Sequence, residues 1–241
     1  MSEQKKGRST RTQLESRGFI EHFDIYPNKR EKEASIVNLN DKQAIKRTIA
    51  AKHLSLFANE EEICKLLLQR LTIEKALYTR MEICKSLQNA TQQVGLLIDY
   101  LAVIPNKQYT TLPKRITKKN SYPLPRDLIA RTLGRMDIEV LPDLLNALVI
   151  KPRKVQREAI IAIGYLLYNN DFSDEIVFKI IEATYYNSKD PVYRWKVMIV
   201  MGQLLPYSTE FLSSIRNDGT LRYKEAQKAL SKQKEISTDE L

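Results

Sequence analysis

A ten-residue pattern that recurs in the second half of the chain constrains its fold more than any other feature. Three copies end in an apolar residue followed by glycine, at Leu133-Gly134, Ile163-Gly164 and Met201-Gly202. In each copy an arginine stands near the start, and mostly apolar residues occupy the positions five, two and one places before the glycine. Those positions lie on one face of an α-helix. The pattern therefore predicts three copies of one amphipathic helix.

This helix recurs at intervals typical of a repeat protein. The spacing is 30 residues from Gly134 to Gly164 and 38 residues from Gly164 to Gly202. A fourth copy, which lacks the glycine, surrounds Arg80, and a weaker fifth lies between residues 221 and 232. Residues 141–148 show the same apolar stripe without the arginine and the glycine, so two kinds of helix alternate. Repetition at this period predicts an array in which each helix pair buries its apolar face against the next pair.

The repeated helix resembles the second helix of HEAT-like repeats, in particular the short type named after phycobilisome lyases. The spacing of Asp190, Arg194, Val197, Met201 and Gly202 fits that pattern best. The resemblance implies an all-α fold, a right-handed α-solenoid of about five stacked helix pairs. It also implies that the second helices line a concave face that grips proteins and, in some members, nucleic acid. The residues assigned to the structural repeat are Arg80, Arg126, Gly134, Gly164, Asp190, Arg194 and Gly202.

Two residue types in the pattern have a direct physical role. A glycine removes a side chain where helices cross, and we expect such a crossing at Gly164. The arginine one turn before the stripe can reach a carboxylate or a helix end in the adjacent repeat. We expect this structural role for Arg80, Arg126 and Arg194, with contact to a ligand as the alternative.

The chain divides into three segments. Residues 1–38 carry many charges of both signs and no sustained apolar period, and we expect a flexible, charged N-terminal segment. Residues 39–234 carry the helical period and form the predicted HEAT-like solenoid. Residues 235–241 are predicted to be a C-terminal tail.

Composition narrows the fold class and the compartment. Seven glycines in 241 residues are too few for a protein built on tight hairpins, which need residues that tolerate positive φ. The chain has no run of 18 apolar residues, so we expect no membrane span. Its two cysteines, Cys64 and Cys84, make no disulfide framework. The basic N-terminus is not followed by an apolar stretch, so no secretory signal is visible and we expect a cytoplasmic protein.

The repeat period is interrupted by a basic insertion at residues 105–126. The distance from Arg80 to Arg126 is 46 residues, and the excess falls between the two helices of one repeat. The insertion contains no acid, so its six cations contribute more than half of the formal net charge of +10. A loop of this length in a compact array is either functional or disordered. The candidate binding residues in this segment are Lys107, Tyr109, Lys114, Arg115, Lys118, Lys119 and Tyr122.

Three interpretations of the insertion stay open at this point. It is a solvated and mobile loop, or it binds an acidic protein surface, or it binds nucleic acid through its cations and a tyrosine stacked on a base. Trp195, the only tryptophan, is a further candidate binding residue. We expect Trp195 to pack in the core or between repeats, with an exposed recognition surface as the alternative. Tyr185 and Tyr186 would form an aromatic patch with it if all three face the same way.

We identify no catalytic residue, no metal site and no cofactor in the sequence. His22 and His53 are the only histidines, and His53 lies on an apolar helix stripe. The sequence contains no CxxC pair, which would indicate a zinc site. No glycine-rich phosphate loop and no nucleophile motif is present.

The function expected from the sequence is therefore a non-catalytic scaffold that holds another macromolecule, with a protein as the expected partner. The alternative is a nucleic-acid-binding HEAT-like protein, similar to a DNA glycosylase family that reads alkylated DNA through a basic concave surface. That family uses aromatic residues and an acid on this surface, for which only Trp195, Tyr185 and Asp190 are candidates here. A bilin lyase is a third class, and only the repeat supports it.

Overall fold

The computed structural model describes residues 9–21, 29–104, 108–116 and 121–239, with side chains up to residue 231. Every regular element in these ranges is an α-helix or a short 3-10 helix, so the predicted all-α class is confirmed. The chain forms two compact units, Met1–Gln93 and Val94–Leu241, which we call unit 1 and unit 2. In the described ranges, no helix has both the length and the apolar character that crossing a bilayer requires.

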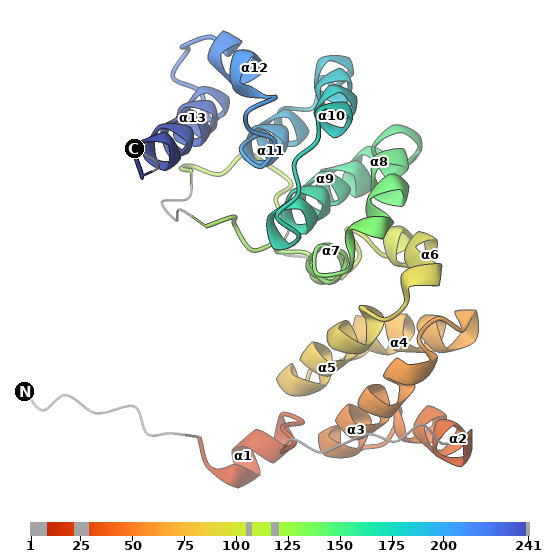
Figure 1. Cartoon of the computed structure of the whole chain (residues 1–241). Coiled ribbons are helices and arrows are strands. Elements are labelled where there is room, and N and C mark those ends of the chain that lie inside the picture. Colours follow the sequence, from red (N-terminus) through yellow and green to blue (C-terminus); the bar gives the residue numbers. More distant parts are fainter. Residues whose placement is uncertain (1–8, 22–28, 105–107, 117–120, 240–241) are drawn as a thin grey trace, which may run out of the picture. The chain divides into compact units, whose positions relative to one another are not determined.

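Unit 1 contains five α-helices in the described residues (Figure 1). They are α1 (Arg11–Ser16), α2 (Lys29–Asn38), α3 (Ala44–Leu54), α4 (Glu61–Ile73) and α5 (Leu77–Leu87), and two 3-10 helices, Ser55–Phe57 and Thr91–Gln93, follow α3 and α5. Helix α3 packs on both α2 and α5. The unit therefore has its core around α3.

Part of the predicted N-terminal segment is built into unit 1. Helices α1 and α2 both lie within residues 1–38. The backbone N–H of Tyr78 donates to the carbonyl of Arg17 at 2.9 Å, and the ring of Phe19 contacts the ring of Tyr78 edge-on at 5.2 Å. These contacts tie residues 17–19 to α5. The flexibility of the segment stays a prediction.

A buried ion cluster joins α3 to the end of α4. The carboxylate of Glu74 accepts hydrogen bonds from Arg47 at 2.7 and 2.9 Å, from Arg70 at 2.9 Å and from the N–H of Ala76 at 2.8 Å. Burial opposes ionisation of Glu74, but these hydrogen bonds outweigh it and bring its pKa to about 2. The cluster is therefore fully charged at neutral pH.

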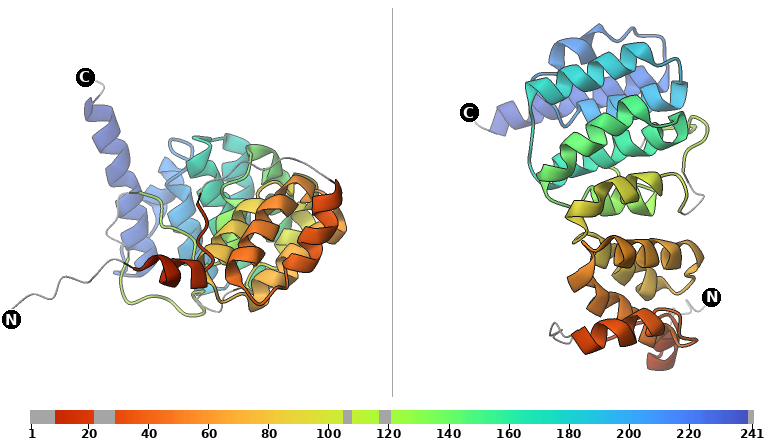
Figure 2. Two further views of the ribbon diagram at one scale, coloured as in Figure 1. Left: turned by 90° about the horizontal axis from the view of Figure 1, so that it is seen from below. Right: turned by 90° about the vertical axis from the view of Figure 1, so that its right-hand side faces the viewer.

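Unit 2 is built from helices of two alternating kinds. They are α6 (Val94–Asp99), α7 (Leu128–Leu133), α8 (Leu141–Ile150), α9 (Arg153–Asn169), α10 (Glu175–Asn187), α11 (Pro191–Met201), α12 (Thr209–Ser214) and α13 (Leu221–Asp239). Helices α7, α9, α11 and α13 lie side by side and form what we call the second-helix layer (Figures 1 and 2). Helices α6, α8 and α10 pack next to one another on this layer, and α12 packs on α13.

The helix boundaries in unit 2 follow local sequence signals. The carboxylates of Asp127, Asp174 and Asp190 accept backbone N–H groups in the first turns of α7, α10 and α11. Pro191 occupies the first position of α11, where a missing N–H costs least. Helix α13 continues to Asp239 and thus includes most of the segment predicted as a C-terminal tail.

The repeat glycines make room for side chains from a neighbouring element. A Cβ atom on Gly134 would lie 2.7 Å from the ring of Tyr165 in α9, and one on Gly202 would lie 3.2 Å from the Cβ of Ala229 in α13. These two glycines therefore accommodate the next helix of the second-helix layer. Gly164 in the centre of α9 instead faces Tyr122, which belongs to the basic insertion.

Candidate functional site

The insertion crosses the second-helix layer. We call its described part, residues 108–116 and 121–126, the strap. The strap contains neither helix nor strand and runs from the end of α6 past α9, α11 and α13 before it returns to α7 (yellow-green in Figure 1). Its contacts, given below, place it on the layer rather than in solvent.

The first anchor of the strap is Tyr109. Its ring contacts the indole of Trp195 edge-on, with ring centres 5.1 Å apart. The guanidinium of Arg126 lies 3.9 Å above the ring of Tyr109 and donates a hydrogen bond to its hydroxyl at 2.7 Å. Trp195 is 4% exposed, and its indole N–H donates to the Oε1 of Glu225 at 3.3 Å. Trp195 is therefore a buried residue against which Tyr109 of the strap packs.

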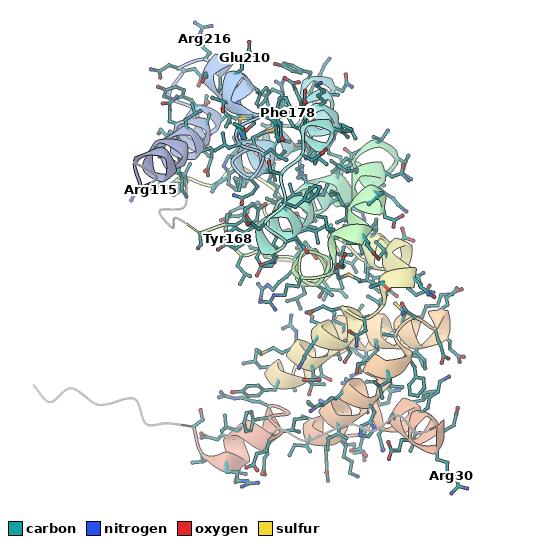
Figure 3. All side chains as sticks on the ribbon, viewed as in Figure 1. Arg30, Arg115, Tyr168, Phe178, Glu210 and Arg216 are labelled. Carbon is teal, nitrogen blue, oxygen red and sulfur yellow. The ribbon has the colours of Figure 1, made fainter. Side chains whose placement is uncertain are left out.

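The second anchor is Tyr122. Its side chain is buried, fills the gap left by the missing side chain of Gly164, and donates from its hydroxyl to the carbonyl of Ile161 at 3.2 Å. The ring also stacks with the rings of Tyr165 and Tyr168, at 6.0 and 6.1 Å between centres, and Figure 3 labels Tyr168. Burial raises the pKa of Tyr122 well above its ordinary value, so the phenol stays protonated.

Polar contacts hold the start of the first strap segment. Asp127 is completely buried, caps α7 and accepts a hydrogen bond from the amide nitrogen of Gln108 at 2.7 Å and from the N–H of Ala102 at 2.9 Å. Burial raises the pKa of Asp127 although these hydrogen bonds oppose the shift. Two residues further along the strap, the carbonyl of Thr110 accepts from Arg157 at 3.4 Å.

A cavity of about 250 Å³ lies beneath the strap. Its lining includes the aromatic rings of Tyr109 and Trp195, the side chain of Arg115, and the charged side chains of Glu158, Lys196 and Glu225. Figure 3 labels Arg115, which is exposed. The cavity therefore combines aromatic rings with charged groups on three helices of the layer.

The three charged residues of this lining, Glu158, Lys196 and Glu225, occupy equivalent positions in three copies of the repeat. Glu158 and Lys196 each stand six residues before a repeat glycine, and Glu225 holds the same position in the weak fifth copy. The ammonium of Lys196 lies 2.6 Å from the carboxylate of Glu158 and also donates to the carbonyl of Arg157 at 2.9 Å. Burial raises the pKa of Glu158 and lowers that of Lys196, against the attraction between the two charges. This set of charged residues was not predicted above, although its sequence signal is a charged residue at one position of three repeat copies.

The arginines of the repeat take different roles from one another. Arg157 forms an ion pair with Asp190 at 2.7 Å and so reaches the cap of the next second helix. Arg194 lies 4.5 Å above the ring of Tyr185 and donates to the carbonyl of that residue at 3.3 Å. Arg126 serves the strap, as described above. In unit 1, the Nε of the half-buried Arg80 has no hydrogen-bond partner.

The other candidates from the sequence are distributed as follows. Lys114 is exposed at the middle of the strap. Lys107, Lys118 and Lys119 lie outside the described residues. Tyr185 and Tyr186 gather with Phe211 at 5.2 and 6.0 Å between ring centres, whereas Trp195 pairs with Tyr109.

The described residues show no group of three or more His, Cys, Asp or Glu side chains that could hold a metal ion. In unit 1, Cys64 is buried, and burial raises the pKa of its thiol to about 12, so it is protonated at neutral pH.

Neither a scan against models of known protein families nor a search of curated proteins finds a match to this chain.

Proposed function

We propose that the protein is a non-catalytic interaction scaffold whose second-helix layer holds an extended segment of another protein. The observation that carries this proposal is the strap itself. An extended segment with two tyrosines already lies on that layer, held by Trp195 at one anchor and by the gap at Gly164 at the other. A surface that accepts such a segment of its own chain has the shape and chemistry to accept one from a partner.

The binding mode of the strap defines what a partner must offer. Aromatic side chains that enter gaps between helices supply most of the binding energy of such contacts. Three prolines, Pro113, Pro123 and Pro125, restrict the unbound strap and lower the entropy lost on docking. The strap is also tethered, which raises its effective concentration, so a partner must compete with it or bind beside it.

We further propose that the helix pairs continue one another as a right-handed HEAT-like solenoid of about five pairs. The alternation of two helix kinds in unit 2 and the fit of Gly134 and Gly202 to the next second helix support this arrangement. Residence in the reducing cytoplasm stays a prediction.

Nucleic-acid binding is the second candidate, and the exposed cations Lys114 and Arg115 favour it. Two observations weigh against it. The guanidinium of Arg126 already covers one face of the Tyr109 ring, on which a base would stack. Asp190, the acid that a glycosylase-like role would need, caps α11 and pairs with Arg157. We therefore prefer the protein-binding scaffold.

The test uses a variant in which residues 108–124 are replaced by a Gly/Ser linker of equal length. A labelled peptide of residues 108–126 should bind this variant in fluorescence anisotropy and should bind the intact protein weakly, because the tethered strap competes. The same peptide with Tyr109→Ala and Tyr122→Ala is the matched control and should lose binding. A folded linker variant that fails to bind the native peptide would refute the proposal.

The nucleic-acid alternative has its own measurement. Anisotropy of labelled single- and double-stranded DNA and RNA is compared at about 50 and 200 mM salt, the range over which phosphate contacts weaken binding steeply. The variant carries Lys114, Arg115, Lys118 and Lys119 all changed to alanine. Binding that falls with salt and disappears in the variant would favour nucleic acid over protein.

A further inference from the structure

A second recess lies where the strap passes the N-terminal ends of α11 and α13. Its volume is about 270 Å³, and its cationic lining consists of Lys189, Arg194 and Arg222. Leu112 of the strap, Pro191, Thr220 and Leu221 also line the recess. The recess is separate from the cavity over Glu158 and Lys196, with which it shares no lining residue.

Arg194 is positioned before any ligand arrives. Its guanidinium lies 4.5 Å from the centre of the Tyr185 ring, and its Nε donates to the carbonyl of Tyr185 at 3.3 Å. Because both contacts use the face and the inner edge of the guanidinium, its two terminal amino groups are left for the recess. Arg222 donates to the hydroxyl of the same Tyr185 at 3.3 Å. One tyrosine thus organises two of the three cations.

The positive charge of the recess exceeds the negative charge near it. Within the described residues, the carboxylate that approaches these cations is Asp218, 3.7 Å from Arg222. The neighbouring Asp190 is directed to Arg157, at 2.7 Å, and to the first turn of α11. No described carboxylate lies within ion-pair distance of Lys189 or Arg194, so two positive charges are not balanced by a local partner.

We propose that this recess binds a doubly charged phosphate group, as in inorganic phosphate or a phosphate monoester. Three convergent cations around one recess suit a single compact dianion better than the spaced single charges of a phosphodiester chain. The backbone N–H groups of Leu221 and Arg222, in the first turn of α13, have no acceptor within the helix and add to the cationic side chains. The N–H of Tyr223 donates to the hydroxyl of Thr220 at 3.4 Å. The inference goes beyond the proposed scaffold function and does not depend on it.

The direct test is isothermal titration of the intact protein with inorganic phosphate at constant ionic strength. Saturable binding to one site is expected. Arg194→Gln and Arg222→Gln should each weaken it about tenfold or more, because each removes a charge-assisted hydrogen bond. Lys224→Gln, an exposed cation on α13 that does not line the recess, is the matched control and should bind like the wild type. Circular dichroism verifies that each variant is folded.

Further arms identify the source of the phosphate and the charge state that binds. A phosphoserine peptide and adenosine monophosphate should compete with inorganic phosphate, whereas chloride and an oligonucleotide without terminal phosphate should not. Binding should weaken as the pH falls from about 7 to 5, because the second pKa of a phosphate monoester is about 6. Asp190 and Asp218 are the carboxylates near the three cations of the recess, and their lowered pKa values keep them ionised over that range. Absence of phosphate binding, or equal loss in Lys224→Gln and Arg194→Gln, would overturn the proposal.

Discussion

At the scale of single residues, the repeat glycines decide which element can pack on which helix. Gly134 and Gly202 face side chains of the next second helix, and Gly164 faces the strap. In all three copies the pattern is the same, but the neighbour differs. The glycine therefore provides space without specifying what occupies it.

Gly164→Ala should loosen the strap. Alanine favours the helix by up to about 1 kcal/mol, but its Cβ would overlap the phenol of Tyr122. Overpacking of this kind costs about 1–3 kcal/mol, so we expect lower stability in urea and faster trypsin cleavage at Lys114 and Arg115. Gly95→Ala in α6 is the control, since its Cβ would meet nothing within 4 Å. Equal behaviour of the two variants would contradict the role of Gly164.

The buried pair of Glu158 and Lys196 leads to a second residue-scale prediction. Glu158→Gln leaves the ammonium of Lys196 buried without its counter-charge and should destabilise the protein by about 3–5 kcal/mol. The double variant Glu158→Leu with Lys196→Met should recover most of that loss, because it removes both desolvated charges. Urea unfolding followed by the fluorescence of Trp195 measures both. A double variant that is no more stable than Glu158→Gln would refute this account of the pair.

At the scale of elements, the strap behaves as an additional layer on the second helices. The sequence predicted an insertion here and showed its charge, because both follow from residue spacing and composition. Its docking depends on Trp195 and Gly164, which lie 86 and 42 residues beyond Tyr109 and Tyr122 in the chain. A local pattern does not encode contacts over such distances, and three interpretations of the insertion therefore stayed open.

Tyr109→Ala should expose the indole of Trp195 and release Arg126. We expect a red shift of the Trp195 emission and a loss of about 0.5–1.5 kcal/mol, the value of an aromatic pair. Tyr109→Phe keeps the ring on the indole and loses only the hydroxyl bonded to Arg126, so its emission should remain close to that of the wild type. A red shift of the same size in both variants would show that the ring contact does not shield Trp195.

At the scale of the whole molecule, the two units differ in how their buried acids respond to pH. In unit 1, hydrogen bonds overcome the burial of Glu74 and bring its pKa to about 2. In unit 2, burial raises the pKa of Asp127. Acidification therefore removes a favourable charge from unit 1, whereas it relieves an unfavourable one in unit 2.

Acid should act on stability through Glu74. Its folded pKa lies below its ordinary value of 4.5, so its contribution is complete above about pH 4.5 and is lost as the pH falls toward 2. The shift corresponds to roughly 3 kcal/mol. Glu74→Gln should lower the melting temperature at pH 7, measured by circular dichroism, and should flatten its decline between pH 4.5 and 2. Parallel pH profiles of the variant and the wild type would refute the assignment.

The sequence by itself determined the helical class and the positions of the repeated amphipathic helices of unit 2. These features are set by the spacing of apolar residues and by caps such as Asp190, which act within one or two turns. Only the tertiary structure decided that the strap covers the second-helix layer, that Trp195 is buried beneath Tyr109, and that Glu158 meets Lys196. The structure also shows that Arg157 makes the contact with the next repeat, through its ion pair with Asp190. Arg126 and Arg194, for which this contact was expected, stack on tyrosines instead. Each of these outcomes depends on side chains that are distant in the chain and meet only after the helices have packed.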